Sequence, residues 1–231
     1  MPDPVRAPGR APEAIPAGEQ TKRLIVDTAV RLFREQGYEK TTMRAIATAA
    51  GLAVGNAYYY FPSKDHLVQE FYALIQQEHR AVAAKTLAAE TELAPRIHGV
   101  LTAAFDVMAP YHGFAGKFIK VAADPDSPLS PFSRESGPAR KISLDIFREV
   151  VAGSTTKIDE EVRAELPDLL WLGQLGVTLF WVHDRSPGQK RTRLLIDRAV
   201  PLVDRLVGLS RLRVMRPVTR EALALYRSLR D

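Results

Sequence analysis

Three side chains between residues 42 and 64 have the types and positions that favour contact with phosphate. Thr42 stands where a helix is expected to begin, so its hydroxyl or the free backbone N–H groups that follow it can hold an anion. Arg44 lies within the next turn, on the exposed side. Lys64 stands at the start of another expected helix, where its charge can meet a phosphate. These residues therefore indicate binding of a phosphate backbone.

The pattern around these residues predicts two short helices joined by a tight turn. The first has an apolar face at spacing i, i+3 and i+4, formed by Met43, Ile46 and Ala47. Gly51 follows it, where a helix end favours a residue with positive φ. The second covers residues 53–60 and ends before Pro62, because the residue before a proline is pushed out of the α region. This is a helix-turn-helix, whose second helix can lie in a DNA major groove.

A longer helix is expected on either side of this pair. Residues 21–36 have apolar positions at i, i+4, i+7 and i+8 and end at Gly37, which completes a three-helix unit. Residues 64–87 are predicted to form one helix that joins this unit to the rest of the chain. Residues 1–19 hold five prolines and no apolar periodicity, which predicts a disordered arm.

Six short motifs follow one another at fixed spacing between residues 21 and 75: Gly37-Tyr38, Thr41-Thr42, Ile46-Ala47, Ala50-Gly51-Leu52, the run from Tyr58 to Phe61, and Ser63-Lys64. In this order they resemble the DNA-binding region of the tetracycline-repressor (TetR) family of bacterial transcription regulators. The resemblance covers about a quarter of the chain. It implies domains at residues 20–66, for DNA binding, and 67–231, for regulation and dimerisation.

The resemblance also implies which residues of the second short helix face DNA: Val54, Gly55, Asn56, Tyr58 and Tyr59. Asn56 can pair with adenine through two hydrogen bonds, and Val54 can meet a thymine methyl group. The two tyrosine hydroxyls suit phosphate, although plain packing is the alternative for the tyrosine run. Tyr60 and Phe61 are expected in the core of the small domain.

Two residues depart from the family pattern. Members commonly carry Ser or Thr where this chain has Ala53, and alanine cannot cap a helix. Gly55 lies inside a helix of about two turns, which lowers its stability. These departures leave the predicted fold intact, but no operator sequence can be transferred from a relative.

Composition excludes several classes of protein. The 231 residues contain no cysteine, which excludes disulfides and thiolate metal sites. No apolar run is long enough for a membrane span, and the N-terminus lacks the apolar region of a signal peptide. A cytoplasmic protein is therefore expected.

The charges are unevenly placed along the chain. Residues 1–64 carry 9 basic and 6 acidic side chains, residues 65–184 carry 11 and 17, and residues 185–231 carry 12 and 4. The basic first segment suits phosphate contact. The basic last segment is interpreted as a solvated helix face, with a second nucleic-acid patch as the alternative.

The second domain is predicted to be all-helical. Apolar spacing and breakers place helices before Pro110, over residues 114–123, around residues 142–151 and over residues 220–229, with a Pro- and Ser-rich loop at residues 124–138. Pro167 is expected to open a very apolar helix. Ser186 and Gln189 are expected to form a capping box for a helix that runs through Leu209.

Two of these helices, from Leu169 to Val182 and from Arg191 to Leu209, are more apolar than a single stripe requires. The resemblance implies that they pair with their copies in a homodimer, which suits a near-palindromic DNA operator. A purely intrachain core is the alternative.

TetR-like regulators generally sense a small molecule in the second domain, so the resemblance implies an effector pocket. The candidate lining residues are large side chains, some with a polar head: Phe105, Met108, Tyr111, His112, Phe118, Phe147, Trp171 and Phe180. An ordinary helical core would use the same residues. If the pocket exists, an apolar or aromatic effector is expected.

An enzyme is the main rival class. His98, His112 and His183 have acidic residues near them in the sequence, but no spacing matches a metal site or a nucleophile elbow. Neither catalysis, a metal nor a cofactor is predicted. The expected protein is a DNA-binding regulator, a repressor by family resemblance, that a ligand releases from DNA. A regulator without a ligand, controlled by protein partners or by its concentration, is the alternative.

Overall fold

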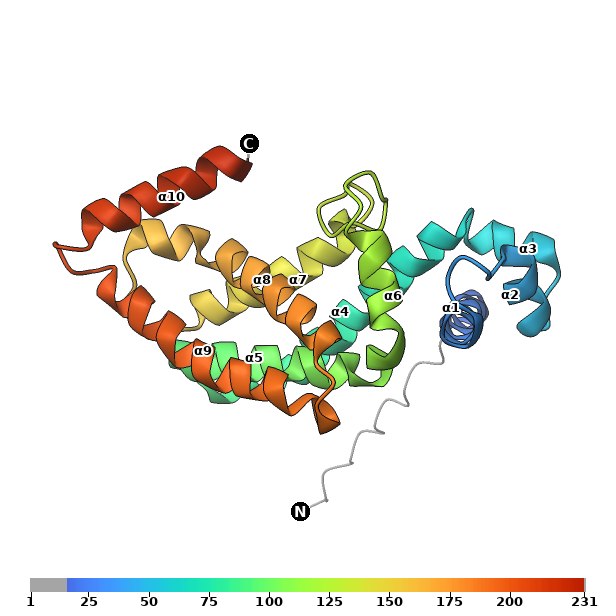
Figure 1. Cartoon of the computed structure of the whole chain (residues 1–231), viewed down its shortest axis with the longest axis horizontal. Coiled ribbons are helices and arrows are strands. Elements are labelled where there is room, and N and C mark those ends of the chain that lie inside the picture. Colours follow the sequence, from blue (N-terminus) through green and yellow to red (C-terminus); the bar gives the residue numbers. More distant parts are fainter. Residues whose placement is uncertain (1–15, 231) are drawn as a thin grey trace, which may run out of the picture. The chain divides into compact units, whose positions relative to one another are not determined.

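The computed structural model describes residues 16–230, and every regular element among them is a helix (Figure 1). These residues divide into two units between Lys64 and Asp65. The predicted all-α class, with a helix-turn-helix unit before a larger helical domain, is confirmed.

The first unit contains α1 (Ala17–Gln36), α2 (Met43–Ala49) and α3 (Val54–Tyr60). Its core includes side chains at most 1% exposed, among them Ile25, Ala29, Phe33 and Ile46. The predicted arm extends too far: residues 17–19 form the first turn of α1, in which the N–H of Glu19 donates to the Pro16 carbonyl at 2.9 Å. The acidic Glu19 favours this helix start. Residues 1–15 of the predicted arm lie outside the described residues.

The second unit is built from seven α-helices, the first of which begins at the last residue of the first unit. They are α4 (Lys64–Ala89), α5 (Leu93–Met108), α6 (His112–Ala122), α7 (Gly137–Ala152), α8 (Glu160–His183), α9 (Lys190–Leu209) and α10 (Arg216–Arg230). The central core joins α5, α7, α8 and α9 through buried residues such as Ile97, Phe147, Leu166 and Ile196. The last helix is longer than the predicted residues 220–229, and α7 begins inside the predicted loop.

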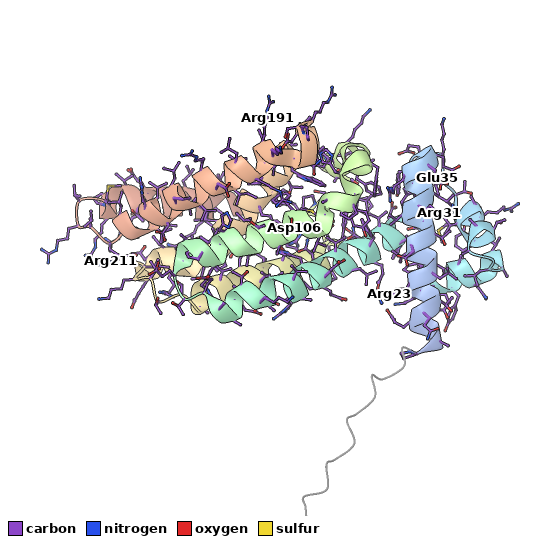
Figure 2. All side chains as sticks on the ribbon, turned by 90° about the horizontal axis from the view of Figure 1, so that it is seen from below. Arg23, Arg31, Glu35, Asp106, Arg191 and Arg211 are labelled. Carbon is purple, nitrogen blue, oxygen red and sulfur yellow. The ribbon has the colours of Figure 1, made fainter. Side chains whose placement is uncertain are left out.

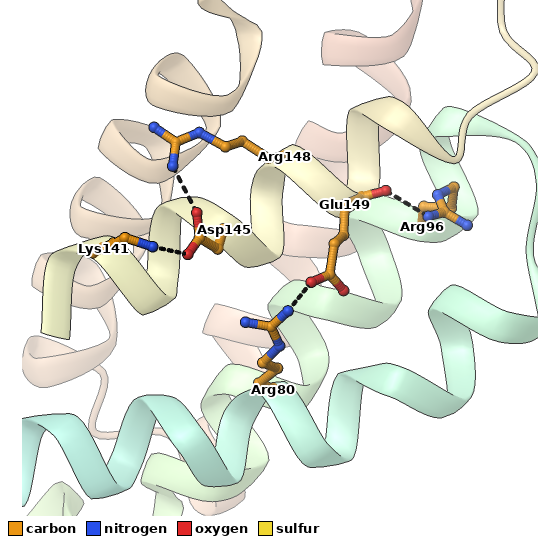
Figure 3. A network of polar contacts seen from close by, with 6 residues as sticks. All are labelled: Arg80, Arg96, Lys141, Asp145, Arg148 and Glu149. Atoms are coloured by element: carbon orange, nitrogen blue, oxygen red, sulfur yellow. Dashed lines mark hydrogen bonds and ion pairs between the residues drawn. The ribbon is translucent and has the colours of Figure 1, made fainter. Parts of the chain in front are cut away.

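Arg96 holds the ends of two helices together from a buried position, 4% exposed (Figure 3). Its guanidinium donates to the carbonyls of Leu87 at 2.8 Å and Glu90 at 2.5 Å, near the end of α4, and to those of Glu149 at 2.6 Å and Val150 at 2.9 Å in α7. Carbonyls at helix C-termini lack partners within the helix and favour a positive charge. The same α4–α7 contact carries the ion pair between Arg80 and Glu149.

One predicted helix start is wrong, and one predicted capping box does not form. Pro167 does not open α8 but lies inside it, because Asp159 caps the helix eight residues earlier by accepting from the Glu161 N–H at 3.1 Å. Burial of Val162, Leu166 and Leu170 offsets the hydrogen bond that the proline removes. Gln189 completes no capping box, since it lies in the left-handed region with φ 50°. The first turn of α9 is capped instead by two side chains: the Ser186 hydroxyl oxygen accepts from the Arg191 N–H at 3.1 Å, and the Asp184 carboxylate accepts from the Thr192 N–H at 2.8 Å.

Candidate functional site

The helix-turn-helix is held in place by local interactions at its two short helices. The Thr42 hydroxyl oxygen accepts from the Ala45 N–H at 3.1 Å, which confirms Thr42 as the cap of α2. Gly51 has φ 70° in the turn, and the Leu52 N–H returns to the Ala47 carbonyl at 2.9 Å. Ala53 precedes α3 without a side-chain cap, as the sequence indicates. The first turn of α3 therefore keeps N–H groups that can meet an anion.

The exposed side of α3 carries the residues expected to face DNA. Ala57 is the one fully buried side chain of this helix. Gly55 and Asn56 are exposed, Val54 is half-buried, and Tyr58 and Tyr59 are 51% and 82% exposed. A tyrosine as exposed as Tyr59 contributes little to its own core, which weighs against the packing interpretation for that residue.

The two residues that follow the exposed tyrosines differ in burial. Tyr60 is half-buried and meets Tyr59 edge to face at 5.1 Å between ring centroids. Phe61 is 3% exposed and belongs to the core, as expected.

The basic residues of the first unit differ in how much of their charge is available. Arg44 is exposed and has no ion pair with another described residue. Arg31 pairs with Glu35 at 3.3 Å along α1, where both are labelled in Figure 2. Lys64 donates to the Tyr38 carbonyl at 2.9 Å and lies 4.3 Å from the centroid of the Tyr38 ring. Because an ammonium has three N–H donors, Lys64 keeps two that can reach a phosphate.

A cavity of about 330 Å³ lies within the second unit. Its wall comes from α4, α5, α6, α7, α8 and the loop before α7, and most of it is apolar. Four of the eight residues expected to line a pocket do so: Met108, Tyr111, Phe118 and Trp171. Pockets of this size and polarity bind small molecules, so the cavity is the candidate effector site.

The other four candidates lie elsewhere. Phe105 and Phe147 belong to the central core, at 3% and 0% exposed. Phe180 is on the surface, 43% exposed. His112 lies behind the wall, where Nε2 is 2.8 Å from the Trp181 carbonyl and the two rings meet edge to face at 4.8 Å. These positions do not follow from residue type, because core, wall and surface all use large apolar side chains.

Several lining residues were not expected, and they come from helices far apart in the sequence. They include Phe71, Tyr72 and Gln76 of α4, Arg140 of α7, and Gln174 and Trp181 of α8. Burial raises the pKa of the Tyr72 hydroxyl, so this group stays protonated. The helical stripe through Phe71 was the one signal in the sequence for a wall contribution from α4.

The three histidines that raised the enzyme alternative make ordinary polar contacts in the structure. Among the described residues, no group of three His, Asp or Glu side chains could hold a metal ion. His98 pairs with Asp197 at 2.7 Å on the surface, and His183 contacts the Leu179 carbonyl within its own helix.

Among the described helices, none is long and apolar enough to cross a membrane.

Both units match known family models. Residues 25–71 match the family described as bacterial regulatory proteins, tetR family, and residues 96–225 match the tetracyclin repressor-like C-terminal domain. The second match alone covers more than half of the chain. This chain belongs to the TetR family of bacterial transcription regulators.

Characterised relatives resemble one part of the chain. The transcriptional repressor KstR of Mycolicibacterium smegmatis is 37% identical over 70 residues, which are 30% of this chain and 33% of that protein. KstR of Rhodococcus jostii is 44% identical over 52 residues, 22% of this chain and 24% of that protein. The matched stretch thus spans about a third or less of these relatives.

Solved structures share the whole fold at low sequence identity. A TetR-family regulator from Syntrophomonas wolfei superposes with a TM-score of 0.65 at 16% identity, covering 85% of this chain and 98% of that one. The regulator FadR from Bacillus subtilis, in complex with stearoyl-CoA, gives 0.62 at 18% identity, covering 80% and 98%.

Proposed function

We propose that this protein is a cytoplasmic transcriptional repressor that binds operator DNA as a homodimer and is released by a small-molecule effector. The observation that carries the proposal is the exposed face of α3. A short helix buries one side chain, Ala57, and presents Asn56, Tyr58 and Tyr59 to solvent. In a helix-turn-helix of the TetR family, such a face is suited to the major groove.

Each exposed residue has a role in this proposal. Asn56 reads adenine through its amide, and Val54 contacts a thymine methyl group, while Gly55 lets the backbone approach closely. Phosphates are bound by Thr42, Arg44 and Lys64 and by the hydroxyls of Tyr58 and Tyr59. The Thr42 oxygen already caps α2, so its hydroxyl hydrogen is the group that faces DNA.

Exposed apolar side chains on α8 and α9 support the homodimer. Six large apolar residues of these two helices are between 42% and 64% exposed: Leu179, Phe180, Leu194, Leu202, Leu206 and Leu209. Leu202, Leu206 and Leu209 follow the i, i+4, i+7 spacing of one helix face. Exposed apolar side chains in such number on two packed helices indicate a surface that a partner covers. A second copy fits best, because two-fold symmetry places two recognition helices about 34 Å apart on DNA.

The cavity supports control by an effector. Its wall includes Phe71, Tyr72 and Gln76 of α4, and α4 follows α3 in the chain after three residues. An effector that changes the position of α4 can therefore change how the recognition helix is presented. To release DNA, it must bind the DNA-incompetent state more tightly than the DNA-bound state. FadR from Bacillus subtilis, whose structure contains stearoyl-CoA, shares this fold and binds a small molecule.

The test is a titration of the purified protein against DNA from upstream of its own gene. A scrambled fragment of the same composition is the control, and both are measured by fluorescence anisotropy over a salt series. We expect tighter binding to the natural fragment, at two protomers per site. If the protein binds no natural fragment better than scrambled DNA, even after selection from fragmented genomic DNA, the proposal fails.

A further inference from the structure

The cavity wall combines aromatic rings with a single charged side chain. Tyr111 meets Phe71 edge to face at 5.0 Å and Phe114 at 6.0 Å between ring centroids. Among the described residues that line the cavity, Arg140 is the one charged residue, and no Asp or Glu accompanies it. Tyr72 stays neutral, because burial raises the pKa of its hydroxyl. The wall therefore carries a positive charge that no negative charge in the wall compensates.

Arg140 keeps hydrogen-bond donors that no described residue uses. Its Nη1 donates to the carbonyls of Pro131 at 2.6 Å and Ser133 at 3.0 Å. Its Nε and Nη2 make no hydrogen bond, and its guanidinium no ion pair, with any residue that the structure describes. Because the guanidinium is planar and rigid, the two carbonyls that hold Nη1 also hold these remaining donors in place. Arg140 is half-buried, so a ligand can reach it.

A hydroxyl without a partner lies one turn further along α7. Ser143 lines the cavity and is 3% exposed, and its Oγ makes no hydrogen bond with a described residue. In the described part of the chain, the one polar side-chain atom that is both fully enclosed and unpaired is Oε1 of Gln174. The Ser143 hydroxyl therefore keeps some accessible surface, and the space beside it is the cavity. Residues three apart on a helix are neighbours, so Arg140 and Ser143 can donate to the same group.

These donors suit a carboxylate. A carboxylate offers two acceptor oxygens, and an arginine can bind both of them through parallel hydrogen bonds. Ser136 and Ala139, at the start of α7, lie in the same wall, and the N-terminus of a helix favours a negative charge. Because most of the wall is apolar, the rest of the ligand must be apolar as well. A cationic ligand would add a second positive charge beside Arg140.

We propose that the cavity binds an apolar carboxylic acid in its ionised form, with Arg140 and Ser143 donating to the carboxylate. The aromatic rings of the wall enclose the apolar body of the ligand. This inference rests on the proposed regulator function and specifies the chemistry of its effector. It makes Arg140 the residue that selects a negatively charged ligand.

The test uses two compounds of the same shape that differ in charge, 4-pentylbenzoate and 4-pentylbenzamide. Near neutral pH the benzoate is ionised and the amide is neutral. Both tryptophans of the chain, Trp171 and Trp181, line the cavity, so intrinsic fluorescence reports binding there. We expect the wild-type protein to bind the benzoate at least about tenfold more tightly than the amide, because hydrogen bonds between charged groups are the stronger ones.

The variant Arg140→Met removes the guanidinium and keeps an unbranched side chain. We expect its preference for the benzoate to fall below about twofold. The variant also removes the two bonds to the loop, but a loosened loop weakens both compounds alike and leaves the preference unchanged. The preference is therefore the measured quantity, and a thermal melt of each variant shows that it is folded.

A second variant and a matched control complete the test. Ser143→Ala leaves the bonds to the loop intact, and we expect it to reduce the preference about threefold. The control is Arg148→Met, at an exposed arginine of α7 that pairs with Asp145 outside the cavity. It should keep the wild-type preference.

Three results would overturn the inference: a wild-type preference below about twofold, the wild-type preference retained in Arg140→Met or in Ser143→Ala, or no saturable binding of either compound. DNA release is measured in parallel and tests the proposed function separately. A preference for the benzoate without any effect on DNA supports the inference and contradicts effector release. Equal binding of both compounds, with release of DNA, contradicts the inference and supports effector release.

Discussion

The carboxylate of Asp184 accepts hydrogen bonds from both the backbone N–H and the hydroxyl of Thr192, each at 2.8 Å. Its other oxygen accepts from the N–H of Ser186 at 2.9 Å and from the hydroxyl of Ser186 at 2.7 Å. Asp184 ends α8 and stands before the N-terminus of α9, where a negative charge is favoured. This one side chain therefore connects the two helices proposed to form the dimer.

Replacing this carboxylate should destabilise the second unit. We expect Asp184→Ala to lower the free energy of unfolding by roughly 2–3 kcal/mol, because it removes a helix cap and several charged hydrogen bonds. The matched control is Asp197→Ala, which removes a surface pair with His98 and should cost less than about 1 kcal/mol. Urea denaturation followed by circular dichroism measures both, and equal effects would contradict the role of Asp184.

Asp184 should also affect how the free energy of unfolding changes with pH. Burial would raise the pKa of Asp184, but the hydrogen bonds from Ser186 and Thr192 outweigh it and hold the pKa well below its usual range. A lowered pKa in the folded state contributes stability above the unfolded value, about 3.9, and that contribution is lost as the pH falls through the folded value. The stability difference between wild type and Asp184→Asn should therefore be constant near neutral pH and shrink below about pH 4. Denaturation curves across this range check it; a difference that grows in acid would contradict it.

Gly99 of α5 lies against the side chain of Thr86 in α4. A Cβ atom there would lie 2.2 Å from Cγ2 and 2.7 Å from Oγ1 of Thr86. We expect Gly99→Ala to destabilise the protein by about 1–3 kcal/mol, because the helices must separate. In the control Gly113→Ala, the new methyl group meets nothing within 4 Å, so stability should stay the same or rise slightly. Chemical denaturation of the two variants separates steric overlap from a general effect of alanine.

Substitutions of Asn56 and Arg44 should distinguish base reading from phosphate binding. We expect Asn56→Ala to lose about 1–3 kcal/mol at the natural site and little on scrambled DNA, because a base contact is specific. Arg44→Ala should weaken binding to both fragments alike and reduce the salt slope by about one. Anisotropy titrations at several salt concentrations measure both. Equal losses on both fragments from Asn56→Ala would show that this residue does not read a base.

Two exposed leucines should control the oligomeric state. Leu202 and Leu206 are 57% and 64% exposed, so the double substitution Leu202→Asp and Leu206→Asp should leave the fold intact and place two charges in the proposed interface. We expect a monomer by analytical ultracentrifugation. Val82→Asp, at a residue of α4 that is 41% exposed, is the control and should remain dimeric. A double variant that stays dimeric would place the interface elsewhere.

The helix-turn-helix could be predicted from residues close together in the sequence. Thr42, Gly51 and Pro62 act on helix ends within a few residues of themselves, and the spacing of Met43, Ile46 and Ala47 determines which face of α2 is buried. Because these effects act between residues close in the sequence, the helix ends and the buried face of α2 depend little on tertiary packing. The apolar spacing of the second domain predicted helices for the same reason, with errors at their ends.

The cavity was decided by tertiary structure. Phe105, Phe147, Phe118 and Phe180 are alike in type, yet two lie in the core, one in the cavity wall and one on the surface. Which side of an apolar helix meets a neighbour, and which meets empty space, depends on helices that approach from distant parts of the chain. The place of Gln174 in the cavity wall has no signal in the sequence, because the wall exists only once α4, α6 and α7 pack around α8. Asp184 likewise became a cap of α9 because the turn after α8 carries its carboxylate back to Thr192.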